Sequence, residues 1–246
     1  MLPALLLAAT LAAAQDPVES ARALLATWHE DRARIDRART LLESAAAANP
    51  APETLVELAR AWFLTGDVRA RSEAEKLAAY EHGREVARRA VAAAPGNDMA
   101  HLWLAMNTGR YAETRGFSAG LKMLPSIREA SDTALRLNPK NVDALILAGG
   151  IFANVPRLMG GDRAKAEAHF KRALELDPHK TSASVELADL YMDTKRWSDA
   201  RQQLQRVVDE TAPTDVPRWT FTEVPQARRL LVELANREPR PAGQSP

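Results

Sequence analysis

Histidine is the residue type in this sequence best suited to bind a metal or to transfer a proton near neutral pH. The five histidines are spread along the chain, at His29, His82, His101, His169 and His179. No two of them show the His-x-x-x-His spacing that places two metal ligands on one face of a helix. His169 directly precedes an apolar residue of a helical pattern, so we expect its ring to face solvent. The histidines predict neither a metal site nor a catalytic base.

Nucleophiles are equally poorly arranged for catalysis. Ser126, Ser131 and Ser184 lie within helical patterns and lack the flanking glycines of a nucleophile elbow. The sequence Gly160-Gly161-Asp162 lacks the Lys-Ser/Thr of a phosphate-binding loop, and a helix N-cap explains these residues. Cysteine is absent, which excludes a thiolate nucleophile, a disulfide and a zinc–cysteine site. The sequence therefore predicts a protein that is not an enzyme, with no catalytic residue, metal or cofactor.

Charge and composition favour a helical binding protein over one that binds nucleic acid. The 33 Lys and Arg residues nearly balance the 32 Asp and Glu residues, so the net charge is +1. Arginines are interleaved with acids, as in residues 32–37 (RARIDR), which is typical of a solvated helix face. No global field therefore attracts nucleic acid or an anionic membrane. Ala, Leu, Arg and Glu dominate the sequence, and all four favour helix.

An internal repeat organises these helices. Four prolines follow helical patterns, and each is preceded five residues earlier by an alanine that lets two helices approach closely. The pairs are Ala45 and Pro50, Ala90 and Pro95, Ala134 and Pro139, and Ala173 and Pro178. Proline lacks a backbone donor and disfavours α conformation at the preceding residue, so each helix should end just before it.

The clearest unit spans Gly161–Pro178 and carries Ala166, Phe170 and Ala173 in a small–large–small order. The next unit repeats the order as Ala200, Leu204 and Val207, after a helix that contains Leu187, Ala188 and Tyr191. This pattern resembles the tetratricopeptide repeat (TPR), in which helical hairpins stack into a superhelix. The resemblance implies an all-α solenoid, and we expect Asp162 and Ser198 to cap the second helices of their hairpins.

We expect about five hairpins and a closing helix. The predicted pairs are Val18–Trp28 with Ile35–Ala48, Glu53–Leu64 with a helix ending near Ala94, Met99–Thr108 with Ile127–Leu137, Val142–Ala153 with Arg163–Leu176, and Ser182–Asp193 with Ser198–Glu210; Val224–Asn236 closes the array. Successive repeat prolines lie 45, 44 and 39 residues apart (95 − 50, 139 − 95, 178 − 139), which exceeds the roughly 34-residue TPR period. The excess falls in Asp67–His82, Tyr111–Pro125 and Val155–Gly160, which we expect to be inserts between the helices of a hairpin.

The order of three motifs makes the match more specific. These are His101-Leu-Trp-Leu-Ala-Met-Asn-Thr-Gly-Arg-Tyr111, Gly116-Phe-Ser-Ala-Gly-Leu-Lys122 and Pro156-Arg-Leu-Met-Gly-Gly-Asp162. Together they resemble the T component of periplasmic TRAP (tripartite) transporters, TatT, and the regulator-of-microtubule-dynamics family. The TatT resemblance implies an apolar passage, a periplasmic solute-binding protein as partner, and possible homo-oligomers. Those relatives are lipid-anchored, whereas this chain has no cysteine for a lipid.

The N-terminus resembles a signal peptide. Residues 1–15 (MLPALLLAATLAAAQ) carry no charged side chain, and Ala12 and Ala14 form an A-x-A cleavage pattern. We therefore expect a leader at 1–14, a TPR domain at 15–237 and a disordered Pro/Gly/Ser-rich tail at 238–246. The leader predicts a periplasmic protein.

In TPR proteins the first helix of each hairpin lines the concave face. The positions predicted to form this groove are Val56, Arg60, Phe63, Leu102, Met106, Arg110, Ile146, Val185 and Met192. Two interpretations compete: the central apolar line is core covered by inserts or by the closing helix, or it is a groove for a hydrophobic ligand or an amphipathic helix. Arg110 and Asn107 either cap a helix and carry surface charge, or contact a polar head group. The function predicted is a TatT-like binding or docking subunit; the alternative is a general periplasmic scaffold for envelope proteins.

Overall fold

The computed structural model describes residues 16–237, and helices account for most of them; this part of the chain contains no strand. The α-helices are α1 (Pro17–Ala26), α2 (Ala33–Ala48), α3 (Pro52–Leu64), α4 (Glu73–Ala93), α5 (Asp98–Arg115), α6 (Phe117–Leu137), α7 (Val142–Asn154), α8 (Arg163–Leu176), α9 (Thr181–Asp193), α10 (Trp197–Asp209), α11 (Val216–Arg218) and α12 (Val224–Arg237). Between them lie two π-helical turns, η1 (Thr65–Arg69) and η3 (Trp219–Glu223), and a 3-10 turn, η2 (Arg157–Met159). The predicted leader at 1–14 and the tail at 238–246 lie outside the described residues.

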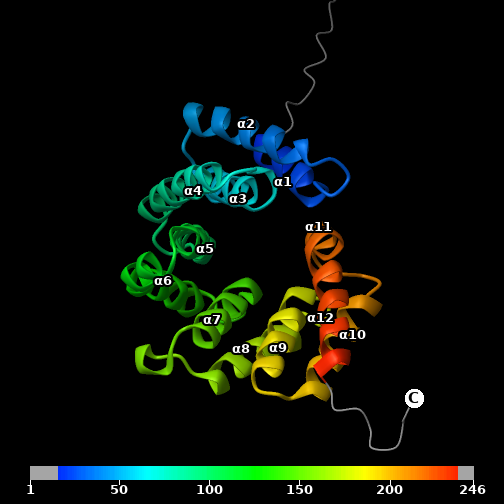
Figure 1. The fold of residues 1–246 in the computed structure, drawn as a ribbon. Helices are drawn as coiled ribbons and strands as arrows, with labels where there is room; N and C mark the ends of the chain where they lie inside the picture. Colours follow the sequence, from blue (N-terminus) through cyan, green and yellow to red (C-terminus); the bar gives the residue numbers. More distant parts are fainter. Residues whose placement is uncertain (1–15, 238–246) are drawn as a thin grey trace, which may run out of the picture.

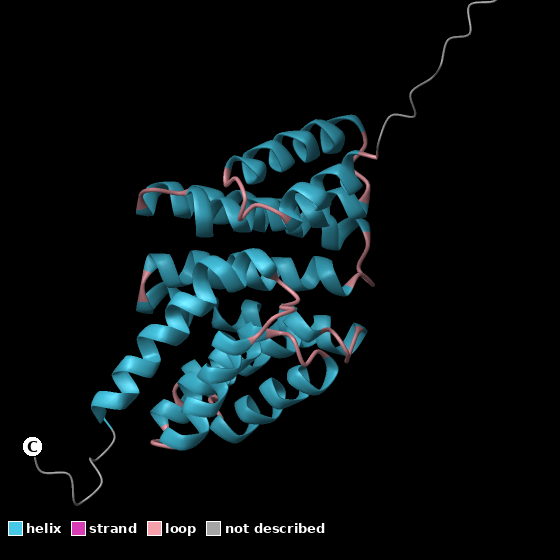
Figure 2. Cartoon of the chain, turned by 90° about the vertical axis from the view of Figure 1, so that its right-hand side faces the viewer, coloured by secondary structure: helices cyan, strands magenta, loops and turns pink. Residues whose placement is uncertain are grey.

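Within the described residues the helices form five consecutive hairpins, α1/α2 to α9/α10, and α12 packs against α10. Viewed along the superhelix, α1, α3, α5, α7 and α9 face the centre, and their partners form the outer layer (Figure 1). From the side, the helices lie stacked on one another (Figure 2). The predicted fold, an all-α solenoid of TPR-type hairpins, is confirmed.

Most of the first two expected inserts lies within helices α4, α5 and α6. α4 begins at Glu73, where the Ser72 side chain accepts a hydrogen bond from the Glu75 backbone. α5 runs on to Arg115, and Gly116, at φ +92°, makes the turn into α6. Glycine tolerates this left-handed conformation without a Cβ clash. The Val155–Gly160 insert stays mostly irregular, as a loop around η2.

One of the two predicted caps is correct. The Asp162 carboxylate accepts hydrogen bonds from the backbone of Ala164 (3.0 Å) and Lys165 (3.1 Å) and so begins α8. Ser198 is not a cap, because α10 begins one residue earlier and its N-cap position, Arg196, makes no side-chain cap bond. Trp197, the first residue of α10, packs against the C-terminal core.

The interior of the described chain consists of two large apolar cores and a thinner middle. The N-terminal core, between Val18 and Ala100, is built by α1 to α5, and the C-terminal core, between Ala166 and Leu234, by α8, α9, α10 and α12. Close helix contacts depend on small residues, as the TPR pattern predicts. Thus a Cβ on Gly149 would lie 2.5 Å from the ring of Phe170, which is fully buried.

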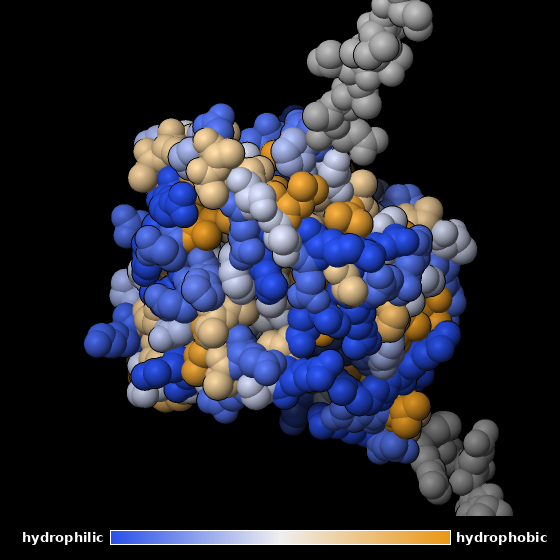
Figure 3. Space-filling model, turned by 90° about the horizontal axis from the view of Figure 1, so that it is seen from above, coloured by the Kyte–Doolittle hydropathy of each residue, from blue (hydrophilic) through white to orange (hydrophobic). Residues whose placement is uncertain are grey.

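The surface shows no membrane-spanning feature in the described part of the chain. No helix there is long and apolar enough to cross a bilayer. Seen from above, hydrophilic and hydrophobic residues are interspersed (Figure 3). The most exposed large apolar side chains are Phe117, Leu158 and Val232.

Candidate binding site on the concave face

Five of the nine predicted groove residues are buried. Val56, Phe63, Leu102, Val185 and Met192 are each exposed by 9% or less. Leu102 packs into a small core with alanines of α6 and α7, and the last two belong to the C-terminal core that α12 completes. These side chains therefore pack between helices and do not line an open groove.

The other four, Arg60, Met106, Arg110 and Ile146, are half-buried and reach the surface. Gly109 follows Met106 by about one turn on α5, and Gly150 follows Ile146 by about one turn on α7. A Cβ added to Gly109 or to Gly150 would meet no atom within 4 Å. We call Met106, Gly109, Ile146 and Gly150 the concave floor. It consists of half-buried positions on α5 and α7, with room for a Cβ at both glycines.

Arg110 is held at the edge of this floor by a carboxylate in the turn after α3. Its Nε and Nη2 donate to Asp67 Oδ1 at 2.9 and 2.7 Å, and the Tyr80 hydroxyl donates to the same oxygen at 2.7 Å. Burial, with the adjacent Asp67 charge, raises the pKa of Tyr80. Arg110 therefore links α5 to η1 and α4, a structural role that neither interpretation of its sequence position included.

Asn107 is fully buried and also structural. Its Nδ2 donates to the carbonyl oxygens of Ala59 (3.2 Å) and Trp103 (2.9 Å), which joins α5 to α3. A Cβ at Gly83 of α4 would lie 2.1 Å from its Oδ1. Asn107 therefore does not reach a ligand in the groove.

Arg60 is the second cation of the concave face, and a buried acid accompanies it. Its Nη1 lies 3.5 Å from Glu57 Oε2. The other oxygen of Glu57 accepts from Arg22 Nε at 2.8 Å. Arg22 also bonds the exposed carboxylates of Glu19 and Glu53, so this end of the groove is a charge network.

Helix α9 carries two partly buried acids, Glu186 and Asp189. Burial raises the pKa of Glu186 and raises that of Asp189 to about 6, and each also feels a neighbouring carboxylate. The charges of Arg218 and, more weakly, Arg110 act in the opposite direction on the pKa of Glu186. Gln226 of α12 donates to Asp189 at 3.3 Å, whereas Glu186 has no hydrogen bond or ion pair to a residue in 16–237. Glu186 is not among the nine groove positions predicted from the sequence.

The raised pKa of Asp189 predicts a pH dependence. Because its folded-state pKa (about 6) exceeds its ordinary value, the folded protein binds this proton more tightly, and stability from this group rises as pH falls from about 6 to 4. Asp189→Asn should therefore raise the free energy of unfolding at pH 7.5 by about 1 kcal/mol and have little effect at pH 4. Urea unfolding at both pH values tests this, with Glu129→Gln as the control, since Glu129 is exposed and its charge does not act on Asp189. An equal effect of both changes would contradict it.

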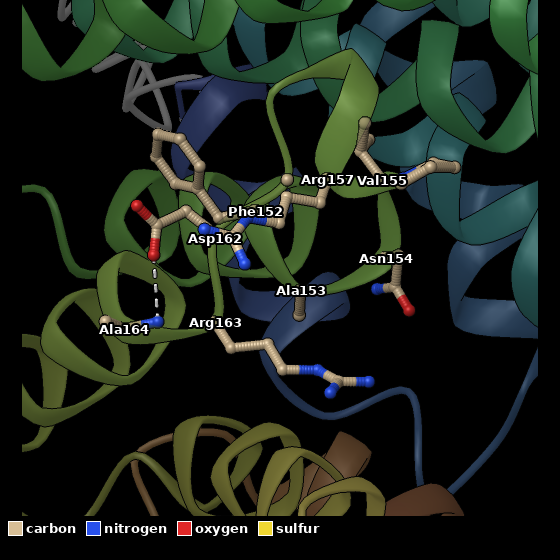
Figure 4. Close-up of a pocket in the computed structure, with 10 residues that line it drawn as sticks. Phe152, Ala153, Asn154, Val155, Arg157, Asp162, Arg163 and Ala164 are labelled. Atoms are coloured by element: carbon tan, nitrogen blue, oxygen red, sulfur yellow. Dashed lines mark hydrogen bonds between the residues drawn. The ribbon is translucent and has the colours of Figure 1, made fainter.

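A separate cavity of about 690 Å³ lies at the irregular insert (Figure 4). Residues 152–157 and 161–164 line it, including the charged side chains Arg157, Asp162 and Arg163. Asp162 is already engaged in capping α8, as the dashed line in Figure 4 shows. The cavity therefore offers two cations in an open polar setting and no arrangement that could carry out a reaction.

His169 does not face solvent freely, contrary to expectation. Its ring stacks on Phe152, with centroids 5.6 Å apart and planes 10° apart, and burial lowers its pKa. Within residues 16–237, no group of three or more His, Cys, Asp or Glu side chains could hold a metal ion.

A family model for regulator of microtubule dynamics proteins 1-3 matches residues 18–155, more than half of the chain. The chain belongs to this family. A tetratricopeptide-repeat model matches residues 157–220. Regulator of microtubule dynamics protein 1 of Bos taurus is 26% identical over 196 residues, which are 72% of this chain and 61% of the relative. The resemblance to this family is thus confirmed.

Other matches support the repeat fold. A DnaJ homolog subfamily C member 7 homolog of Schizosaccharomyces pombe is 39% identical over 69 residues, 28% of this chain and 13% of that protein. The chain therefore spans less than two thirds of either curated relative. A thermophilic TPR protein of Thermus thermophilus aligns with a TM-score of 0.64 and 24% identity over 88% of this chain and 99% of that one. A chain of the APC/C hetero-tetramer Cut9–Hcn1 aligns with a TM-score of 0.58 and 14% identity, over 89% of this chain and 43% of that one. These structures show the fold, a scaffold type that generally mediates protein–protein interaction and is generally not catalytic.

Proposed function

We propose that the protein is a non-catalytic docking subunit whose concave floor binds an amphipathic helical segment of a partner protein. The observation that carries the proposal is the concave floor of Met106, Gly109, Ile146 and Gly150, four half-buried residues with room for a Cβ at both glycines. An amphipathic helix buries an apolar stripe in such a groove. Methionine adapts its shape to different apolar partners.

The acids of α9 favour a polypeptide over a simple apolar ligand. Glu186 and Asp189 are partly buried, whereas Arg60 and Arg110 are already paired with Glu57 and Asp67. A helix can present bases to the two acids of α9, beside its apolar stripe. Opposite charges across an interface fix the orientation of the partner and exclude wrong partners.

The finer proposal is that the partner is a periplasmic solute-binding protein of a TRAP-type transporter. It rests on the motif resemblance to TatT and on the apolar leader at 1–14. The alternative is a general periplasmic scaffold that docks envelope proteins through the same groove. Recovery of the protein in the cytoplasmic fraction, with residues 1–14 still attached, would contradict the periplasmic part of both.

A hydrophobic small molecule is the second candidate occupant, because the open floor is apolar along both helices. Native mass spectrometry of protein purified from its host distinguishes the two. A bound mass of fatty-acid size that Gly150→Glu removes would favour the small molecule, whereas a clean apo mass favours the docking role.

Photo-crosslinking tests the docking role directly. The chain has no cysteine, so a single Gly150→Cys can carry a benzophenone label in the groove, and Leu158→Cys carries it on an exposed tip as the control. We expect the groove label alone to react with an amphipathic segment of one partner. Adding Ile146→Asp should weaken this capture at least tenfold, since a buried charge opposes an apolar contact. Identical capture by both labels would overturn the proposal.

Ile146 also contacts the core, so its replacement could destabilise the protein. Gly150→Glu provides an independent test, because a Cβ at this position meets no atom within 4 Å. Circular dichroism should show this second variant as stable as the wild type, while an unlabelled Gly150→Glu protein should fail to bind the segment identified by crosslinking.

A further inference from the structure

The two ends of the superhelix meet. In Figure 1, α11 lies beside α1, so the chain closes into a ring. The contact is between Trp28, just after α1, and Phe221 of η3, whose ring centroids lie 5.6 Å apart at a 31° tilt. The guanidinium carbon of Arg32 lies 4.8 Å from the centroid of the same Phe221 ring. Nearly the whole described chain separates these partners in sequence.

This seam is thin compared with the joins between neighbouring hairpins. Among residues 16–237, no extensive helix packing connects α1 or α2 with α9, α10 or α12. The two large cores also share no residue. Phe221 remains 42% exposed although it touches Trp28, which is 4% exposed. The closure therefore depends on a few side chains.

Both sides of the seam are firmly anchored. Trp219 Nε1 donates to the Val207 carbonyl at 2.8 Å, which ties the start of η3 to α10. At the end of η3, buried Glu223 accepts from the Thr181 hydroxyl and pairs with Arg218. Trp28 belongs to the N-terminal core. Phe221 is thus presented on a fixed π-helical turn, and the contact joins two well-packed halves.

The middle of the ring is where these halves could move. In the part of the chain that the structure describes, the large cores are separated by small apolar clusters whose buried residues are mostly alanines. They are Leu102, Ala134 and Ala144, and Leu145, Ala173 and Ala183. Small side chains make fewer contacts than large ones, so helix sliding costs least at this point.

We propose that Trp28, Arg32 and Phe221 form a latch that closes the superhelix and releases at this seam to widen the concave space. An aromatic pair and a cation over a ring are weak contacts, so losing them should change the closed-to-open ratio by about tenfold. A latch of this strength keeps the ring closed at rest and yields to a binding partner. The entry of a partner rests on the proposed function; the opening itself does not.

Spin labels can report the opening without any ligand. Because the chain has no cysteine, Ala47→Cys on α2 and Arg228→Cys on α12 give one defined label pair at exposed positions. We expect a single narrow distance distribution by double electron–electron resonance. Phe221→Ala should add a longer, broader population, and Arg32→Ala should add a smaller one.

Phe117→Ala is the matched control, since this phenylalanine is 74% exposed and lies outside the seam. It should leave the distances unchanged. Identical distributions for Phe221→Ala and the wild type would overturn the latch, as would a broad distribution in all variants. If the latch opens but crosslinking at Gly150 captures no partner segment, only the proposed function fails.

Discussion

Replacing Gly149 by alanine should lower the free energy of unfolding by about 1–3 kcal/mol, whereas the same change at Gly150 should not lower it. A Cβ on Gly149 would lie 2.5 Å from Phe170 Cε1, and that ring is fully buried. At Gly150 the Cβ meets no atom within 4 Å. There the gain in helix propensity should stabilise the protein by roughly 0.5–1 kcal/mol.

Urea unfolding of the two variants measures this contrast within one helix. Combining Gly149→Ala with Phe170→Leu should cost less than the sum of the single changes, because the smaller side chain makes room for the new methyl group. Equal stabilities of the two glycine variants would show that α7 can shift away from α8. The close approach at the small position of the repeat would then not be obligatory.

The hairpins were predictable because the TPR pattern records packing between adjacent helices. Phe170 is a large side chain that packs against a small one, and Asp162 caps the start of a helix. Both features can be recognised from neighbouring residues in the sequence. The extension of α5 and α6 was not predictable from the repeat period. Tyr111–Arg115 and the residues after Gly116 continue the helices, although the period alone suggested inserts.

The candidate site was harder to predict, because burial there depends on the path of the whole superhelix. Val185 and Met192 occupy concave positions of their repeat, yet they belong to the core that α12 completes. A Cβ at Gly109 or Gly150 meets no atom within 4 Å, and this depends on where helices distant in sequence are placed. The contact of Trp28 with Phe221 depends on the accumulated turn of five hairpins, which no local pattern specifies.

Removing the Asp67 carboxylate should lower the free energy of unfolding by about 2–3 kcal/mol. Asp67 retains 15% side-chain exposure and accepts from both Arg110 and Tyr80. Asp67→Ala would leave the buried Tyr80 hydroxyl without this acceptor. The loss is smaller than for a fully buried pair, because the Arg110 side chain is 42% exposed and still reaches solvent.

Glu113, the other carboxylate of Arg110, gives a matched comparison. It lies 2.9 Å from Arg110 Nη1 but is 68% exposed, so Glu113→Ala should change stability by no more than about 0.5 kcal/mol. Asp67→Asn should fall between the two alanine variants, since an amide oxygen can still accept from Tyr80. Chemical unfolding of the three variants at pH 7 should therefore rank Asp67→Ala as least stable. If Asp67→Ala and Glu113→Ala were equally stable, Arg110 would be a surface charge, and its alternative role as a contact for a ligand in the groove would regain support.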